Sequence, residues 1–169
     1  MNRILKILPF YLLIVFGCNA QDIEPSDFIP TGYSEFEKHF GDLNKDGLND
    51  CVLIIKNTDT ANIVTNRFDK KVDRNRRGII VLFKNEKGYQ LADINFDCFS
   101  SENEDGGVYF APELGIEIKN NKLYFLYGHG RYGYWKYTFR FQKSNFELIG
   151  YDSSSDRGPI TMSETSINF

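Results

Sequence analysis

Residues 42–50 read DLNKDGLND and lead directly into residues 51–55, which read CVLII. The first stretch places oxygen-bearing side chains at loop positions 1, 3, 5 and 9, and Gly47 permits a sharp turn without a Cβ clash. The second stretch is an uninterrupted apolar run, which is typical of a strand buried on both faces. A polar turn entering a buried strand therefore predicts a β-fold with a candidate metal loop between strands.

The loop offers oxygen ligands of the kind that calcium prefers. They are the side chains of Asp42, Asn44, Asp46 and Asp50 and the backbone carbonyl of Leu48. Ca²⁺ takes six to eight oxygens at about 2.3–2.6 Å, and closely spaced carboxylates repel one another when no cation lies between them. The alternative is an Asp/Asn/Gly turn that binds no ion, but the four spaced side chains favour Ca²⁺.

The loop is not an EF-hand, because loop position 12 is Leu53 rather than Glu and an apolar strand follows instead of a helix. Residues 41–54 resemble an FG-GAP or VCBS-type repeat, in which a calcium loop links two strands of a propeller-like blade. Residues 80–89 match the second strand and its glycine-bearing turn in that family. The resemblance spans about residues 41–92 and implies the five calcium ligands named above. With one such loop, a closed propeller is not expected.

Further apolar and aromatic runs alternate with Gly- and Asn-rich turns and predict three hairpins. Their strand pairs are residues 79–83 with 89–92, 116–118 with 123–126, and 137–141 with 146–149. Tyr33, Phe36 and Phe40 fit either two helical turns or an extended strand. The predicted fold is all-β, an antiparallel β-meander resembling propeller blades.

Two segments interrupt this pattern. Residues 57–77 contain no clear strand and are rich in Lys and Arg. This segment is either a basic patch that binds an acidic partner or a solvated insertion, and the insertion is favoured. Residues 100–107 are acidic and predict a loop tip. The sequence ends in a strand-like segment, residues 167–169, which is the pattern expected of a chain that continues.

The composition fits one globular domain. The chain has 169 residues, 41% hydrophobic and 25% charged, and the 15% aromatic content favours strands. A net charge of −3 argues against a diffuse basic surface for nucleic acid.

The N-terminus predicts a targeting segment. Arg3 and Lys6 precede an apolar run over residues 7–16, which is too short to span a bilayer. Residues 15–18, VFGC, resemble a bacterial lipobox, which implies cleavage before Cys18 and a lipid on Cys18. The alternative is an ordinary signal peptide cleaved after Ala20, which would give a secreted protein.

The predicted organisation is therefore a lipoprotein signal peptide (1–17), a tether (18–30) and a single β-domain (31–169). Residues 21–24 resemble the surface-export signals of Bacteroidetes lipoproteins. The expected location is the outer membrane, the cell surface or the periplasm, with the protein held to the membrane by its N-terminal lipid.

Two further cysteines are Cys51 and Cys98. They either form a disulfide, which an oxidising cell envelope would permit, or are buried free thiols. Their strand-like surroundings favour free thiols. With no histidine near them, they do not predict a zinc site.

Catalytic motifs are weak. His39 and His129 are the only histidines, and neither lies in a nucleophile motif. Residues 127–137, YGHGRYGYWKY, interleave aromatics with Gly, Arg and His, a composition that suits stacking on a sugar or gripping a peptide. Candidate ligand-binding residues are His129, Arg131, Tyr132 and Tyr134, whereas Trp135 and Tyr137 are expected to fill the core.

The predicted function is that of a non-enzymatic calcium-binding lipoprotein of the bacterial cell envelope, structural or recognition in role. The alternative is a carbohydrate- or protein-binding module that uses residues 127–137 to bind a glycan or an envelope protein. An uncharacterised hydrolase comes third.

Overall fold

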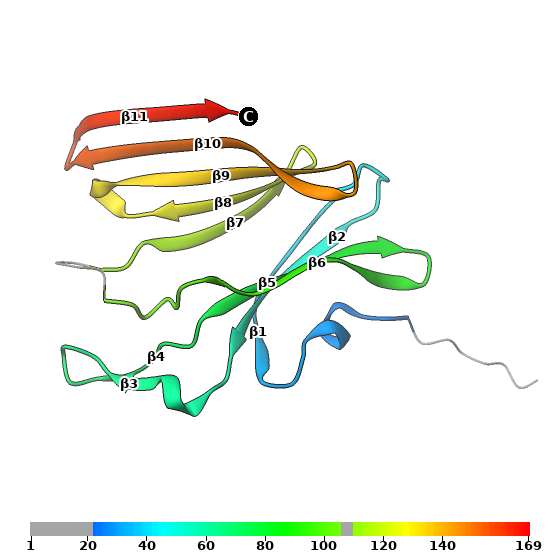
Figure 1. The fold of residues 1–169 in the computed structure, drawn as a ribbon, viewed down its shortest axis with the longest axis horizontal. Helices are drawn as coiled ribbons and strands as arrows, with labels where there is room; N and C mark the ends of the chain where they lie inside the picture. Colours follow the sequence, from blue (N-terminus) through cyan, green and yellow to red (C-terminus); the bar gives the residue numbers. More distant parts are fainter. Residues whose placement is uncertain (1–21, 106–109) are drawn as a thin grey trace, which may run out of the picture.

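Antiparallel sheets make up the computed structural model, which describes residues 22–105 and 110–169 (Figure 1). The predicted all-β meander is confirmed. The first main sheet has the order β1–β2–β5–β6, with β1 (Tyr33–Gly41), β2 (Asp50–Asn57), β5 (Arg77–Asn85) and β6 (Gly88–Phe99). The second main sheet has the order β11–β10–β9–β8–β7, with β7 (Glu113–Lys119), β8 (Lys122–Gly128), β9 (Gly133–Gln142), β10 (Asn145–Arg157) and β11 (Ile160–Asn168).

Short elements complete the chain: a two-stranded sheet of β3 (Ile63–Thr65) and β4 (Lys71–Asp73), and the 3₁₀ turns η1 (Pro25–Phe28), η2 (Thr60–Asn62) and η3 (Gly130–Tyr132). Across the described ranges, no helix has the length and apolar character needed to cross a membrane. The predicted signal peptide and Cys18 lie outside the described residues.

The hairpins form where the turn residues predict them. The two central turn residues between β7 and β8, Asn120 and Asn121, both have positive φ, and so do Lys143 and Ser144 between β9 and β10. Two-residue turns of this kind match the twist of the strands that they connect. Of the two alternatives for Tyr33 to Phe40, the extended strand is correct, since β1 pairs with β2 along this whole stretch.

The central strands β2 and β5 are buried on both faces. On one face, Val52, Ile54, Ile79 and Val81 pack toward the second sheet. The residues of the other face are Cys51, Leu53, Ile55, Ile80 and Leu82. Both faces of these strands therefore need a covering layer.

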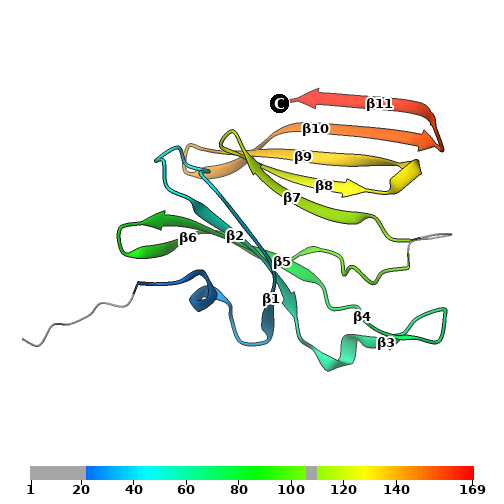
Figure 2. The same cartoon turned by 180° about the vertical axis from the view of Figure 1, so that it is seen from behind.

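The N-terminal segment supplies one of those layers. Phe28 and Ile29 pack against the outer face of the first sheet, on the side away from the second sheet (Figure 2). The backbone N–H of Tyr89 donates to the carbonyl of Ile23 at 3.0 Å, which ties this segment to β6. From Ile23 onward, the predicted tether is thus packed against the domain.

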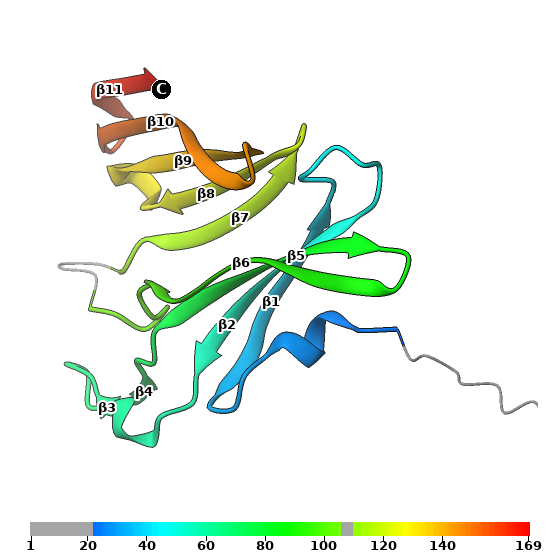
Figure 3. The ribbon, with the colours of Figure 1, turned by 45° about the vertical axis from the view of Figure 1, so that its right-hand side comes forward.

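The two main sheets approach each other at β1 and β7. A Cβ on Gly41 would lie 2.5 Å from Cγ2 of Ile118, so the strands are in contact only because position 41 has no side chain. Close by, the Asn121 side-chain amide donates to the carbonyl of Asp42 at 3.0 Å. This corner, at which the β1–β2 loop lies beside the β7–β8 turn, is visible in Figure 3.

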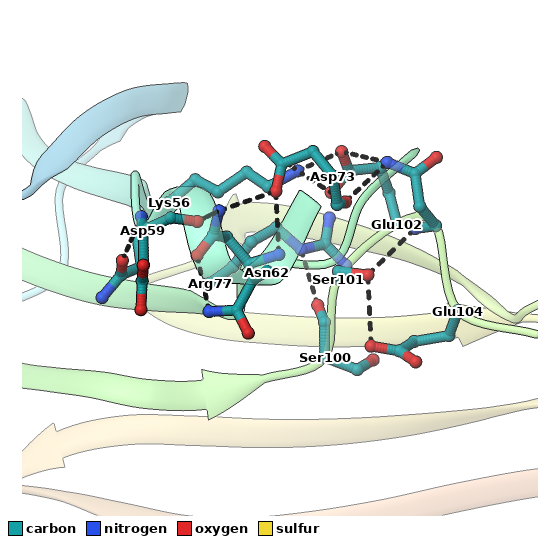
Figure 4. A network of polar contacts seen from close by, with 12 residues as sticks. Lys56, Asp59, Asn62, Asp73, Arg77, Ser100, Ser101, Glu102 and Glu104 are labelled. Carbon is teal, nitrogen blue, oxygen red and sulfur yellow. Dashed lines mark hydrogen bonds and ion pairs between the residues drawn. The ribbon is translucent and has the colours of Figure 1, made fainter. Parts of the chain in front are cut away.

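The insertion between β2 and β5 differs from the prediction. The expectation that residues 57–77 contain no clear strand was wrong, because β3 and β4 form a short hairpin there. A polar network ties the hairpin down (Figure 4). In it, the buried Lys56 ammonium pairs with Glu102 at 2.5 Å and with Asp73 at 3.1 Å.

The same network holds residues 100–105, which were predicted to be a loop tip. The guanidinium of Arg77, itself buried, donates to the carbonyl of Ser100 at 2.8 Å and lies over the ring of Phe36. Arg74 pairs with Asp105 and Arg76 pairs with Asp97. These arginines are thus paired within the chain, which supports the insertion interpretation over a basic docking patch.

We expect Gly41→Ala to destabilise the protein by about 1–3 kcal/mol, because the new methyl group overpacks the contact with Ile118. Urea unfolding measures this change. In an Ile118→Ala background the same substitution should cost clearly less, since the clashing methyl is absent. Gly128→Ala is the matched control, because a Cβ there meets nothing within 4 Å. Equal costs at the two glycines would contradict the tight corner.

Candidate functional site

The loop between β1 and β2 folds its polar side chains onto its own backbone. The Asp42 carboxylate accepts hydrogen bonds from the backbone N–H groups of Lys45 at 2.6 Å and Gly47 at 3.2 Å. Lys45 and Gly47 have φ of 69° and 84°, the left-handed region that favours glycine. The chain therefore curls around Asp42.

The next two oxygen-bearing side chains continue the curl. Asn44 Oδ1 accepts from the backbone N–H of Asp46 at 3.0 Å, and Asp46 Oδ1 accepts from that of Leu48 at 2.8 Å. The Asn44 amide also donates to the second Asp46 oxygen at 2.9 Å. Asn44 and Asp46 thus meet within the loop, and the Leu48 side chain is exposed.

Asp50, at the start of β2, has a structural role that the sequence did not reveal. Its side chain is fully buried, and its two oxygens accept from the backbone N–H groups of Leu43 at 2.7 Å and Lys84 at 3.0 Å. One carboxylate therefore fastens the loop to β5. Burial raises the pKa of Asp50, the backbone hydrogen bonds act against that rise, and the nearby Asp46 charge adds to it.

The donor set of the loop has the chemistry that a hard cation requires. Three carboxylates, one amide oxygen and a backbone carbonyl come from nine consecutive residues, and each carboxylate oxygen that accepts one N–H keeps a further lone pair. Within the two described ranges, no three or more His, Cys, Asp or Glu side chains form a ready-made metal cluster. The loop therefore does not hold Asp42, Asp46 and Asp50 together as a preformed group of carboxylates.

Residues of the aromatic segment 127–137 line two sites, and Trp135 lines both. His129, Tyr132 and Tyr134 line a small pocket of about 280 Å³, with serines of β10 and β11 on its other side. His129 Nε2 lies 2.7 Å from the carbonyl of Phe110. Arg131 lies beside the Tyr132 ring, with a guanidinium nitrogen 3.2 Å from the Tyr132 hydroxyl. Three of the four predicted ligand-binding residues thus share one pocket.

Trp135 and Tyr137, which were expected to fill the core, are half-buried and line a second, larger site. This site is an apolar cleft of about 640 Å³ between the two main sheets. No sequence pattern indicates this cleft, because a strand pattern shows which residues face inward but not how far apart two sheets lie.

The cysteines are free thiols. Cys51 lies near the β2 end that pairs with Leu82, whereas Cys98 lies near the opposite end of β5, where Arg77 pairs with Phe99. The expectation that both are buried was wrong for Cys98, which is exposed at the cleft. Desolvation by apolar neighbours raises the pKa of Cys98 to about 11, so its thiol stays protonated at neutral pH.

Asp50→Asn should destabilise the metal-free protein by about 1–3 kcal/mol, because the amide nitrogen cannot accept one of the two buried backbone N–H groups. Asp46→Asn is the control: it keeps an oxygen for Leu48, is exposed, and should change the free energy of unfolding by less than about 0.5 kcal/mol. Chemical denaturation with chelator present measures both. Similar unfolding midpoints for the two variants would refute the bracing role of Asp50.

Comparisons with protein-family models, with curated protein sequences and with solved structures gave no match. The assignment of residues 41–92 to an FG-GAP or VCBS-type repeat therefore stays a prediction from the motif. What the site does is inferred below from its geometry and chemistry.

Proposed function

We propose that this chain is a non-enzymatic calcium-binding module of the bacterial cell envelope, held to the membrane by a lipid on Cys18. Its calcium ligands are the side chains of Asp42, Asn44, Asp46 and Asp50 and the carbonyl of Leu48. The role of the ion is structural: it rigidifies the loop that enters the central strand β2.

The observation that carries this proposal is the curl of the loop. The backbone already takes the left-handed turns at Lys45 and Gly47 that direct successive Asx side chains inward. Asp50 joins the loop to β5, and Asn121 joins it to the β7–β8 turn. A cation at this position would offset the repulsion among the carboxylates and stiffen the corner between the two main sheets.

Both histidines lie within hydrogen-bond distance of a partner in their own part of the fold. His39 Nε2 lies 3.1 Å from a Glu37 carboxylate oxygen, and His129 contacts the carbonyl of Phe110. Each imidazole thus has a structural partner.

Calcium should raise the thermal midpoint of the protein. An ion that binds only the folded state adds about 2.7 kcal/mol at one hundred times its Kd, and we expect a Kd on the order of 10⁻⁵–10⁻³ M because the loop lacks the Glu at position 12. Asp46→Ala should abolish the shift, whereas Glu86→Ala, which removes an exposed carboxylate from another turn, should keep it. A midpoint that is the same in millimolar calcium and in chelator would refute the calcium site.

A second candidate function rests on the small pocket beside η3. It combines the rings of Tyr132 and Tyr134 with the hydroxyl-bearing residues Ser153, Ser155 and Ser163. Stacking faces beside hydrogen-bonding edges are suited to a sugar ring. This supports carbohydrate binding at the envelope as the alternative role.

If this alternative holds, a glycan array should give hits that Tyr134→Ala removes, since that substitution deletes an exposed stacking face of the pocket. Phe68→Ala, which removes an exposed ring from the β3–β4 turn, should leave the hits unchanged. Binding that survives in Tyr134→Ala and in Tyr132→Ala would exclude the pocket.

A further inference from the structure

The cleft between the main sheets has the size of a small-molecule site. The sheets touch at the β1–β7 corner and diverge toward β6, where the space reaches about 640 Å³. Sites for small ligands typically measure about 300–1,000 Å³.

One wall of the cleft is a sheet of rings. It is built by Phe125 and Tyr127 of β8 and by Trp135, Tyr137 and Phe139 of β9. Tyr127 and Trp135 stack with their ring centroids 5.2 Å apart and their planes 16° apart. Ile79 and Val81 of β5 lie at the bottom of the cleft and are nearly covered by these rings, and Phe99 of β6 contacts Phe125 at a centroid distance of 5.4 Å. The half-buried rings therefore form the accessible apolar wall, which is complementary to a flat apolar body.

Apart from the tyrosine hydroxyls and the indole N–H of the aromatic wall, the polar lining residues lie on β6 or directly after it. They are Asp93, Asn95, Cys98 and Ser100. Among the residues that line the cleft, Asp93 is the one with a formal charge at neutral pH, since the Cys98 thiol stays protonated. The arginines nearest to Tyr127 have other partners: Arg76 pairs with Asp97, and Arg77 binds the Ser100 carbonyl. An anionic ligand would thus meet a like charge at the mouth.

We propose that this cleft binds a flat, apolar small molecule that is uncharged or cationic and directs a hydrogen-bonding group toward Asp93 and Asn95. The half-buried rings of β8 and β9 supply most of the contact area. The polar edge of β6 sets the orientation and disfavours acids such as fatty-acid carboxylates. This site is separate from the calcium loop, and the proposal does not depend on calcium.

Two dyes with the same aromatic body test the proposal. N-phenyl-1-naphthylamine is uncharged, and 1-anilinonaphthalene-8-sulfonate adds one negative charge. Trp135 is the only tryptophan in the chain and lines both the cleft and the small pocket, so energy transfer from it reports a bound dye, and the Cys98→Phe variant described next assigns that dye to the cleft. We expect one uncharged dye per chain, with saturable transfer, and about tenfold weaker binding of the sulfonate, which Asp93→Asn should bring close to that of the uncharged dye.

Cys98→Phe should block the mouth and weaken binding of the uncharged dye by about tenfold or more. Leu126→Phe is the matched control, because Leu126 lies between the lining residues Phe125 and Tyr127 on β8 and its exposed side chain points to the far face. Near-UV circular dichroism checks that each variant is folded.

A measurement on the unmodified chain is independent of any folding defect in the variants. The bound uncharged dye should slow alkylation of Cys98 by iodoacetamide. Peptide mass spectrometry measures the alkylation rate. Loss of dye binding in Leu126→Phe but not in Cys98→Phe, equal affinity for the two dyes, or an unchanged alkylation rate would each overturn the proposal.

Discussion

The constraint on which this fold depends is that its two central strands are apolar on both faces. β2 and β5 place Val52, Ile54 and Val81 toward one side and Leu53, Ile80 and Leu82 toward the other. A single antiparallel meander would leave one of these faces in water, at a cost of about 25 cal/mol for each Å² of apolar surface exposed. The second sheet and the N-terminal segment are the two layers that prevent this.

The way in which the second sheet covers the first determines where the two candidate binding sites lie. The contact is tight at the corner where Gly41 meets Ile118, and the space widens toward β6. The candidate calcium loop sits at the tight corner, and the apolar cleft lies at the open side. The two candidate sites thus lie at different places along the same contact between the sheets.

Much of the fold could be predicted from local signals. The run from Cys51 to Ile55 and the turn residues Asn120 and Asn121 determine strands and hairpins through short-range chemistry, and the structure has them as expected. Long-range features could not be predicted in this way. The burial of Lys56 depends on Asp73 and on Glu102, which lie far away in the sequence.

In the candidate loop, too, local features could be predicted from the sequence and long-range contacts could not. Its oxygen-bearing residues follow from spacing alone, and so does the turn at Gly47. That Asp50 reaches the backbone N–H of Lys84 depends on the pairing of β2 with β5, and no local pattern reports it. The cleft was missed for a related reason: alternation identifies Trp135 and Tyr137 as inward residues but does not show what faces them.

Under the proposed lipid attachment at Cys18, the docking of the N-terminal segment on β6 would limit how far the domain can stand from a bilayer. Ile23 is already joined to Tyr89, and five peptide units separate it from Cys18. A fully extended chain of that length spans at most about 17 Å. With so short a linker, the domain would lie against the lipid headgroups rather than move freely at a distance from them. Any molecule that binds the domain would then encounter it at the membrane surface.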